Sequence, residues 1–347
     1  MEFMGFKIKR ELPSSAEIIA ATSLSAIGKK QKKQRDLELK DIFEGTSDKF
    51  VVIIGPCSAD DENTVIKYIE KLAEVNEKVK EKLFIVPRIY TNKPRTTGEG
   101  YKGMMHQPDP TSEPNLADGI KAIRNMHIRC IEETGLTAAD EMLYPDNLVF
   151  VHDLLGYIAI GARSVENQQH RLAVSGVDIP VGLKNPTSGD LSVMFNGIRA
   201  AHSSHSFIYR NKEVETTGNP LAHGVMRGSV NRHGEDNPNY HWEDLERAAE
   251  MYKERKLKNP MIVVDTNHSN SGKKFKQQPR IASDILYTRE HNEGIRAVVR
   301  GLMIESYLIE GRQDIKSGTY TRGQSITDPC LGWDDTERLL YYIAEKV

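Results

Sequence analysis

Charged and metal-binding side chains recur in this chain at one kind of position, directly after short apolar runs. Such runs, rich in β-branched residues, predict strands. In chain order the residues at their ends are Cys57, Arg88, Glu141, Arg163, Lys184, Arg227, His268 and Glu305. Any one of them could be a buried thiol or a surface ion-pair partner. Their recurrence at equivalent positions predicts one site for anions and a metal ion.

Four of the chemically active residues could form the metal site. Cys57, His268 and Glu305 follow the first, seventh and eighth predicted strands, and Asp328 lies in the segment SITDPC. A thiolate and an imidazole combined with carboxylates suit a divalent Mn, Fe, Co or Zn ion better than Mg or Ca. Four protein ligands leave a position open for water or a substrate carbonyl, so the ion could act as a Lewis acid.

Six cationic side chains are expected at the same place. Lys93 and Arg95 follow the second predicted strand and join the four that end strands: Arg88, Arg163, Lys184 and Arg227. Crowded cations repel one another unless anions neutralise them, and Arg forks suit phosphates and carboxylates. Because one phosphate needs about two or three such groups, six imply two anionic substrates or one bisphosphate.

The segment at 91–115 is 25 residues long and has little periodicity. A connection of that length within a compact domain is usually functional or disordered. It carries Lys93, Arg95 and Thr96 close to the strand end. We expect it to fold over a phosphate group.

The elements that must position these residues alternate between strands and helices. Predicted strands cover 50–56, 83–90, 136–142, 157–163, 180–185, 205–210, 260–268 and 298–306, with a ninth candidate at 222–228 paired with or continuing the sixth. Helical periodicity appears at 64–79, 116–133, 191–202, 242–256, 281–292 and 334–346. This alternation predicts an α/β fold, a (β/α)8 TIM barrel, over 48–347. Two Rossmann-like domains are the alternative, but no G-x-G-x-x-G follows the first strand.

Composition excludes several classes of protein. Of 347 residues, 47 are Lys or Arg and 49 are Asp or Glu, so a formal net charge of -2 argues against a nucleic-acid or membrane partner. The basic run at 29–35 predicts a solvated helix face, since no aromatic residue is interleaved. No apolar run reaches the roughly 18 residues of a membrane span, and three cysteines favour free thiols in a cytoplasmic protein.

Several blocks of sequence resemble one family from about residue 50 onward. They are GPCSAD, PRIYTNKPRTTGEGYKG, AIGARSVENQQHR, PVGLKNPTSGD, NHSNSGKKFKQQ, IESYLIEGRQ and GQSITDPCLGWDDTERLL. These blocks resemble the type I 3-deoxy-D-arabino-heptulosonate-7-phosphate (DAHP) synthases. The resemblance implies a barrel with an N-terminal extension (1–47) that makes oligomer contacts, an extra hairpin after strand 6, and a homodimer or homotetramer.

The resemblance also implies an activity. The family is a group of metal-dependent transferases that condense phosphoenolpyruvate with D-erythrose 4-phosphate and water, giving DAHP and phosphate. This is the first step of the shikimate pathway to chorismate and the aromatic amino acids. The small-molecule substrates and the divalent metal are the implied partners of this chain.

Roles for single residues follow from the matching motifs. Cys57, His268, Glu305 and Asp328 would bind the metal, Asp328 also bordering the substrates. Arg88, Arg163, Lys184 and Arg227 would bind phosphoenolpyruvate, with Glu141 beside them, while Arg95 and Thr96 would bind erythrose 4-phosphate. Lys93, Cys57 and His268 would be the catalytic residues, with Lys93 close to the reacting carbons.

Two other functions stay open at this point. A 3-deoxy-D-manno-octulosonate 8-phosphate synthase shares the barrel and the phosphoenolpyruvate pocket, but it carries an Asn-rich motif where this chain has KPRT. A non-catalytic barrel that senses phosphorylated sugars would have damaged metal ligands, yet all four are present.

Regulation is where the chain departs from the family pattern. YPDNLVF at 144–150 differs from Phe- or Tyr-sensitive forms, and the hairpin stretch at 210–220 is several residues short. We therefore expect weak or absent inhibition by Phe and Tyr. Steady-state rates measured with each amino acid at millimolar concentration test this, and strong inhibition by either would contradict it.

Overall fold

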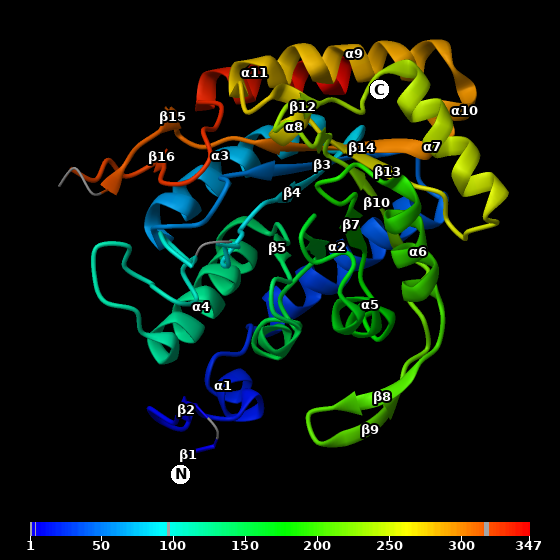
Figure 1. Cartoon of the computed structure of the whole chain (residues 1–347). Coiled ribbons are helices and arrows are strands. Elements are labelled where there is room, and N and C mark those ends of the chain that lie inside the picture. The colour runs from blue at the N-terminus through cyan, green and yellow to red at the C-terminus, as the bar shows by residue number, and fades with distance from the viewer. Residues whose placement is uncertain (1, 4, 96–97, 316–318) are drawn as a thin grey trace.

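The computed structural model describes residues 2–3, 5–95, 98–315 and 319–347. Its centre is a sheet of eight strands, all parallel, in the order β4-β3-β14-β13-β10-β7-β6-β5 (Figure 1). The strands are β3 (Phe50–Gly55), β4 (Leu83–Pro87), β5 (Ala139–Glu141), β6 (Tyr157–Ile160), β7 (Val181–Lys184), β10 (Ala222–Met226), β13 (Ile262–Asp265) and β14 (Val299–Glu305). A parallel bridge between Arg88 and Ala139 joins the two edges. The predicted (β/α)8 barrel is therefore confirmed.

Helices connect the strands on the outside of the barrel. They are α3 (Glu62–Val79), α4 (Leu116–Thr134), α5 (Gln168–Ser175), α6 (Leu191–His202), α7 (Trp242–Glu254), α8 (His268–Ser271), α9 (Gln278–His291), α10 (Glu293–Val298) and α11 (Trp333–Lys346), with 3-10 turns η1 (Pro145–Phe150) and η2 (Phe275–Gln277). Helix α3 shows why they form: Val65, Ile69 and Leu72 recur at helical spacing and are buried, and the Asp61 side chain accepts from Thr64 N at its start.

The sixth barrel strand differs from the prediction. Strand β10 holds that place, with all five residues buried between β7 and β13. The run at 205–210 instead supplies β8 (Ser206–Tyr209), which pairs with β9 (Lys212–Glu215) as an antiparallel hairpin that projects from the barrel (Figure 1). The hairpin thus precedes the sixth barrel strand. Its aromatic and β-branched residues resemble those of a barrel strand, but its side chains are exposed or half-buried in alternation, as on a surface ribbon.

Short pairs of strands complete the structure. They are β1 (Glu2–Phe3) with β2 (Phe6–Lys7), β11 (Ser229–Val230) with β12 (Asp236–Asn237), and β15 (Ile309–Arg312) with β16 (Gln324–Ser325). The β11–β12 pair directly follows the sixth barrel strand, and β16 leads into the segment that carries Asp328.

The N-terminal segment closes one end of the barrel. It forms α1 (Ser15–Ala21) and α2 (Ala26–Glu44), and α2 buries Leu39, Ile42 and Phe43 among the residues that fill the barrel interior. The ring of Phe43 lies 4.6 Å from that of His223, which belongs to the amino-terminal half of β10. Helix α2 therefore plugs the amino-terminal end of the barrel.

The interior next to this plug is tightly filled. Tyr157 Oη and His223 Nε2 are 2.8 Å apart, and burial lowers the pKa of His223 to about 3, so its ring stays neutral. At Gly182 a Cβ would lie 2.0 Å from Tyr157 Oη. The place of the Tyr157 side chain therefore requires glycine on the neighbouring strand β7.

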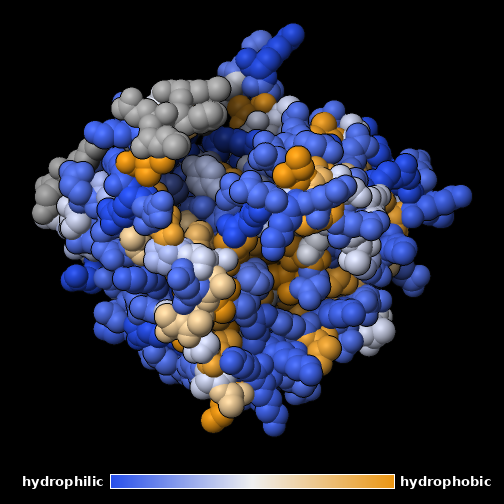
Figure 2. All heavy atoms as spheres, turned by 90° about the horizontal axis from the view of Figure 1, so that it is seen from below, coloured by the Kyte–Doolittle hydropathy of each residue, from blue (hydrophilic) through white to orange (hydrophobic). Residues whose placement is uncertain are grey.

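The basic run on α2 behaves mostly as expected. Lys29, Lys30 and Lys33 are exposed, but Arg35 is half-buried, with its guanidinium 3.7 Å from the centre of the Phe84 ring and Nη2 donating to Ile85 O. In the described part of the chain, no helix is both long and apolar enough to cross a membrane. Hydrophilic side chains dominate the face shown in Figure 2, with hydrophobic ones in smaller groups.

The plug predicts a measurable loss of stability. Phe43→Ala should lower the free energy of unfolding by about 3–5 kcal/mol, because it leaves a cavity at a fully packed barrel end. Ile27→Ala on the same helix is the control, since Ile27 is 71% exposed and should cost under about 0.5 kcal/mol. Urea unfolding measures the free energy of unfolding of both variants. Equal losses of stability would contradict the role of α2 as a plug.

Candidate functional site

The residues predicted to carry chemistry lie at one rim of the barrel. Glu141, Lys184 and Glu305 are the last residues of their strands, and Arg88 and Arg227 directly follow theirs. Cys57, Arg163 and His268 lie two or three residues further along the chain. Because all eight strands are parallel, their carboxyl ends meet at the same rim.

Three of the four expected metal ligands form a tight group. One potential ligand atom from each of Cys57, Glu305 and Asp328 lies within 4.8 Å of the other two. His268 borders this group, with Nε2 3.8 Å from Glu305 Oε1. Asp328 comes from the segment after β16, where the Ser325 hydroxyl donates to Asp328 O at 2.7 Å.

The donor set of this group fits a divalent ion. Buried acidic groups cost free energy unless cations meet them. Here a thiol and two carboxylates converge, with an imidazole beside them, as in sites for first-row transition metals. Burial, and then the negative charge of Glu305, raises the pKa of the Cys57 thiol to about 11. An ion bound here would therefore displace the thiol proton.

Lys93 is the nearest cation to the group. Its ammonium donates to Cys57 Sγ and lies 3.4 Å from Asp328 Oδ2. Burial opposes the charged form, but the acidic groups of Cys57, Asp328 and Glu305 outweigh burial and raise the pKa of Lys93. The Lys93 side chain is therefore a fixed positive charge at the expected point of reaction.

The anion-binding half of the site begins at Arg88. Its Nη2 donates to Glu305 Oε1 at 2.8 Å and to Cys57 O at 3.2 Å. Its Nε and Nη1 are buried and have no partner among the residues that the structure describes. Buried donors of this kind are rare unless a ligand meets them. Arg88 therefore connects the metal-type group to a place where an anion is expected.

Two further cations lie beside it. Lys184 and Arg227 are 5% and 7% exposed, the first 2.9 Å from Asp265 Oδ2 and the second donating to Ser269 Oγ at 3.2 Å. Burial raises the pKa of Glu141, while Lys184, Lys93 and Arg88 act against that rise. The expected substrate-binding residues thus concentrate positive charge next to the carboxyl group of Glu141.

Arg163 and Arg95 lie further out. Arg163 is exposed, and its charge contributes to lowering the pKa of Arg227, for which burial is the larger cause. Arg95 is part of the connection at 91–115, where its Nε donates to Tyr101 O at 2.8 Å. Thr96 lies outside the described residues.

The connection itself folds back on its first residues. Lys93 N donates to Lys102 O, and Met105 N donates to Thr91 O. Gly103 has a φ of +100°, and a Cβ there would lie 2.3 Å from Thr91 O. This close return, which glycine permits, holds Lys93 at the rim.

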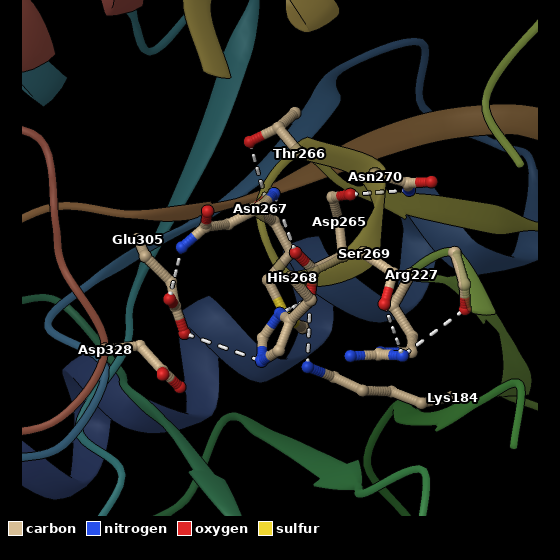
Figure 3. A network of polar contacts seen from close by, with 12 residues as sticks. Lys184, Arg227, Asp265, Thr266, Asn267, His268, Ser269, Asn270, Glu305 and Asp328 are labelled. Carbon is tan, nitrogen blue, oxygen red and sulfur yellow. Dashed lines mark hydrogen bonds and ion pairs between the residues drawn. The ribbon is translucent and has the colours of Figure 1, made fainter. Parts of the chain in front are cut away.

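The sequence reasoning did not identify Asp265, Asn267 and Lys273. Asp265 contacts both Lys184 and His268, Asn267 Nδ2 donates to Glu305 Oε2 at 2.6 Å (Figure 3), and Lys273 Nζ lies 3.1 Å from Asp328 Oδ1. One signal could have revealed Asp265. It is an acidic residue that ends the apolar run PMIVV, three residues before His268.

Comparison with known proteins places this geometry in a family. Residues 24–341 match the model of the DAHP synthetase I family. A phospho-2-dehydro-3-deoxyheptonate aldolase of Haemophilus influenzae is 38% identical over 322 residues, 91% of this chain and 86% of that protein. The Trp-sensitive enzyme of that name from Escherichia coli K12 is 37% identical over 89% of this chain and 87% of its own.

A solved structure agrees with these relatives. The phospho-2-dehydro-3-deoxyheptonate aldolase of Francisella tularensis SCHU S4 superposes with a TM-score of 0.90 and 31% identity, over 98% of both chains. The barrel, the rim of charged strand ends and the sequence similarity therefore agree: this chain belongs to the DAHP synthetase I family.

Proposed function

We propose that this protein condenses phosphoenolpyruvate with D-erythrose 4-phosphate and water, giving DAHP and inorganic phosphate, the first step of aromatic amino acid biosynthesis. The observation that carries the proposal is the contact between two unlike halves of one site. Cys57, Glu305 and Asp328 form a metal-type group, and the buried cation Arg88 pairs with Glu305 of that group. Such a site can hold a polarised aldehyde beside a doubly anionic partner.

The chain offers Cys57, His268, Glu305 and Asp328 as ligands of a divalent ion. Such an ion, when bound, supplies Lewis-acid polarisation of the aldehyde oxygen of erythrose 4-phosphate. The donor set suits Mn, Fe, Co or Zn. His268, which borders the group in this structure, is assigned by the same chemistry.

The remaining residues bind and orient the two substrates. Phosphoenolpyruvate binds to Arg88, Lys184 and Arg227, because its phosphate and carboxylate suit these buried cationic groups. Arg163 contributes from the outer edge. Arg95 and Thr96 take the phosphate or hydroxyls of erythrose 4-phosphate. Lys93 stands at the reacting carbons.

The reaction follows from this arrangement. C3 of phosphoenolpyruvate attacks the aldehyde carbon, and the cations around Arg88 stabilise the charge that develops. Water then adds at C2, and phosphate leaves as the C–O bond breaks. In this proposal the ammonium of Lys93 is a candidate proton donor to the new alkoxide.

Assembly and location belong to the same proposal. We infer a homodimer or homotetramer in the cytoplasm, with contacts made by the segment at 1–47 outside the buried face of α2. Apolar side chains at Phe6 and Ile8 are 69% and 60% exposed, and Ile208 on the β8–β9 hairpin is 82% exposed. Exposed apolar side chains of this kind favour contacts between subunits.

One assay separates the proposed function from its alternatives. Purified protein with phosphoenolpyruvate should release phosphate with erythrose 4-phosphate, much more slowly with arabinose 5-phosphate, and with neither after treatment with EDTA. Restored activity on adding Mn²⁺ or Co²⁺ is the control for EDTA damage. A preference for arabinose 5-phosphate would indicate the octulosonate enzyme, and no release with either sugar would indicate a sensor.

The unpartnered donors of Arg88 lead to a second test. Arg88→Met should lower kcat/KM for phosphoenolpyruvate by about 100-fold or more, because two charge-assisted hydrogen bonds of about 1.5–3 kcal/mol each are lost. Arg163→Met is the matched control and should have a smaller effect, since Arg163 is exposed at the same rim. Calorimetric titration of metal-free protein with phosphoenolpyruvate should show the same ranking, and the reverse ranking would refute the role of Arg88.

A further inference from the structure

Asp265 lies between the two halves of the site. It is the last residue of β13 and is fully buried. Its Oδ2 is 2.9 Å from Lys184 Nζ and 2.8 Å from His268 Nδ1, while its Oδ1 accepts from Asn267 N at 3.0 Å (Figure 3). One carboxylate oxygen is therefore shared by an anion-binding residue and an expected metal ligand.

The contact with His268 directs the imidazole ring. His268 begins α8 with a φ of +47°, in the left-handed region, which costs free energy for a residue with a side chain. Its Nδ1 lies 2.8 Å from Asp265 Oδ2 without forming a well-directed hydrogen bond. With Nδ1 turned to Asp265, Nε2 faces Glu305 and the metal-type group. Carboxylates placed in this way behind a metal-binding histidine orient the ring and strengthen it as a ligand.

The contact with Lys184 holds a buried ammonium at the rim. Asp265 Oδ2 is the one acidic partner of Lys184 within ion-pair distance among the described residues. An anion that binds Lys184 must weaken the attraction between the Lys184 ammonium and Asp265. The carboxylate then acts more fully on His268, because the Lys184 ammonium and the Nδ1 side of the His268 ring compete for the same oxygen.

We propose that Asp265 is a positioning residue that couples the two ligand sites: phosphoenolpyruvate at Lys184 tightens metal binding through His268, and the metal tightens phosphoenolpyruvate binding in return. The coupling must be reciprocal, because it is a free energy shared by two binding events. The proposal rests on the function proposed above. It adds to that function a coupling between the two ligand sites through Asp265, which contacts no substrate atom in the proposed mechanism.

The test measures metal binding directly. Metal-free full-length protein is titrated with Co²⁺, with and without phosphoenolpyruvate, and followed by the absorbance of the cobalt–thiolate bond to Cys57. Asp265→Asn should weaken Co²⁺ binding by about 10–100-fold. In this variant phosphoenolpyruvate should increase the affinity for Co²⁺ less than in the wild type. The increase that remains should come from direct attraction between Co²⁺ and phosphoenolpyruvate.

A pair of variants decides the matter even if Asp265→Asn fails to fold. Lys184→Met and Arg227→Met each remove one buried cation of the rim, but only the first contacts Asp265, since Arg227 donates to Ser269 and Gly228. Without phosphoenolpyruvate, Lys184→Met should bind Co²⁺ several-fold more tightly than Arg227→Met. Equal affinities of these two variants would overturn the coupling, whatever Asp265→Asn shows.

The outcome also separates this inference from the proposed function. Wild-type protein that binds Co²⁺ and forms DAHP, with equal cobalt affinities in Lys184→Met and Arg227→Met, refutes the coupling and leaves the function intact. Wild-type protein that binds no Co²⁺ and forms no product refutes both.

Discussion

The site depends on one buried ion pair, between Arg88 and Glu305. Their side chains are almost fully inaccessible and 2.8 Å apart, and such a pair gives little net stability while the loss of either partner is costly. Arg88 also forms the bridge to Ala139 that closes the barrel. The backbone of Arg88 thus joins the two sheet edges, while its guanidinium holds a carboxylate of the metal-type group and offers free donors to an anion. Barrel closure and the site therefore share one residue.

Much of this could be predicted from the sequence because strand periodicity and helix periodicity are local. Helix α6 coincides with the predicted range at 191–202, and the residues expected at the strand ends lie at one rim. The run at 205–210 predicts a barrel strand because aromatic and β-branched residues favour surface hairpins and barrel strands alike. What distinguishes them is burial on both faces, which β10 has and β8 lacks.

The contacts that could not be predicted join residues that are far apart in the sequence and meet only in the folded chain. Helix α2 carries lysines around much of its surface, so its buried Leu39, Ile42 and Phe43 give no clear apolar stripe. Asp265 can be recognised as an acidic strand end, but its sharing between Lys184 and His268 depends on side chains from different strands. Thr96 and its contacts lie outside the described residues.

The plug formed by α2 also affects how ligands reach the strand ends. With the amino-terminal end filled by Phe43 and its neighbours, ligands must enter and leave through the opposite mouth. Both proposed substrates would therefore share one route to the strand ends.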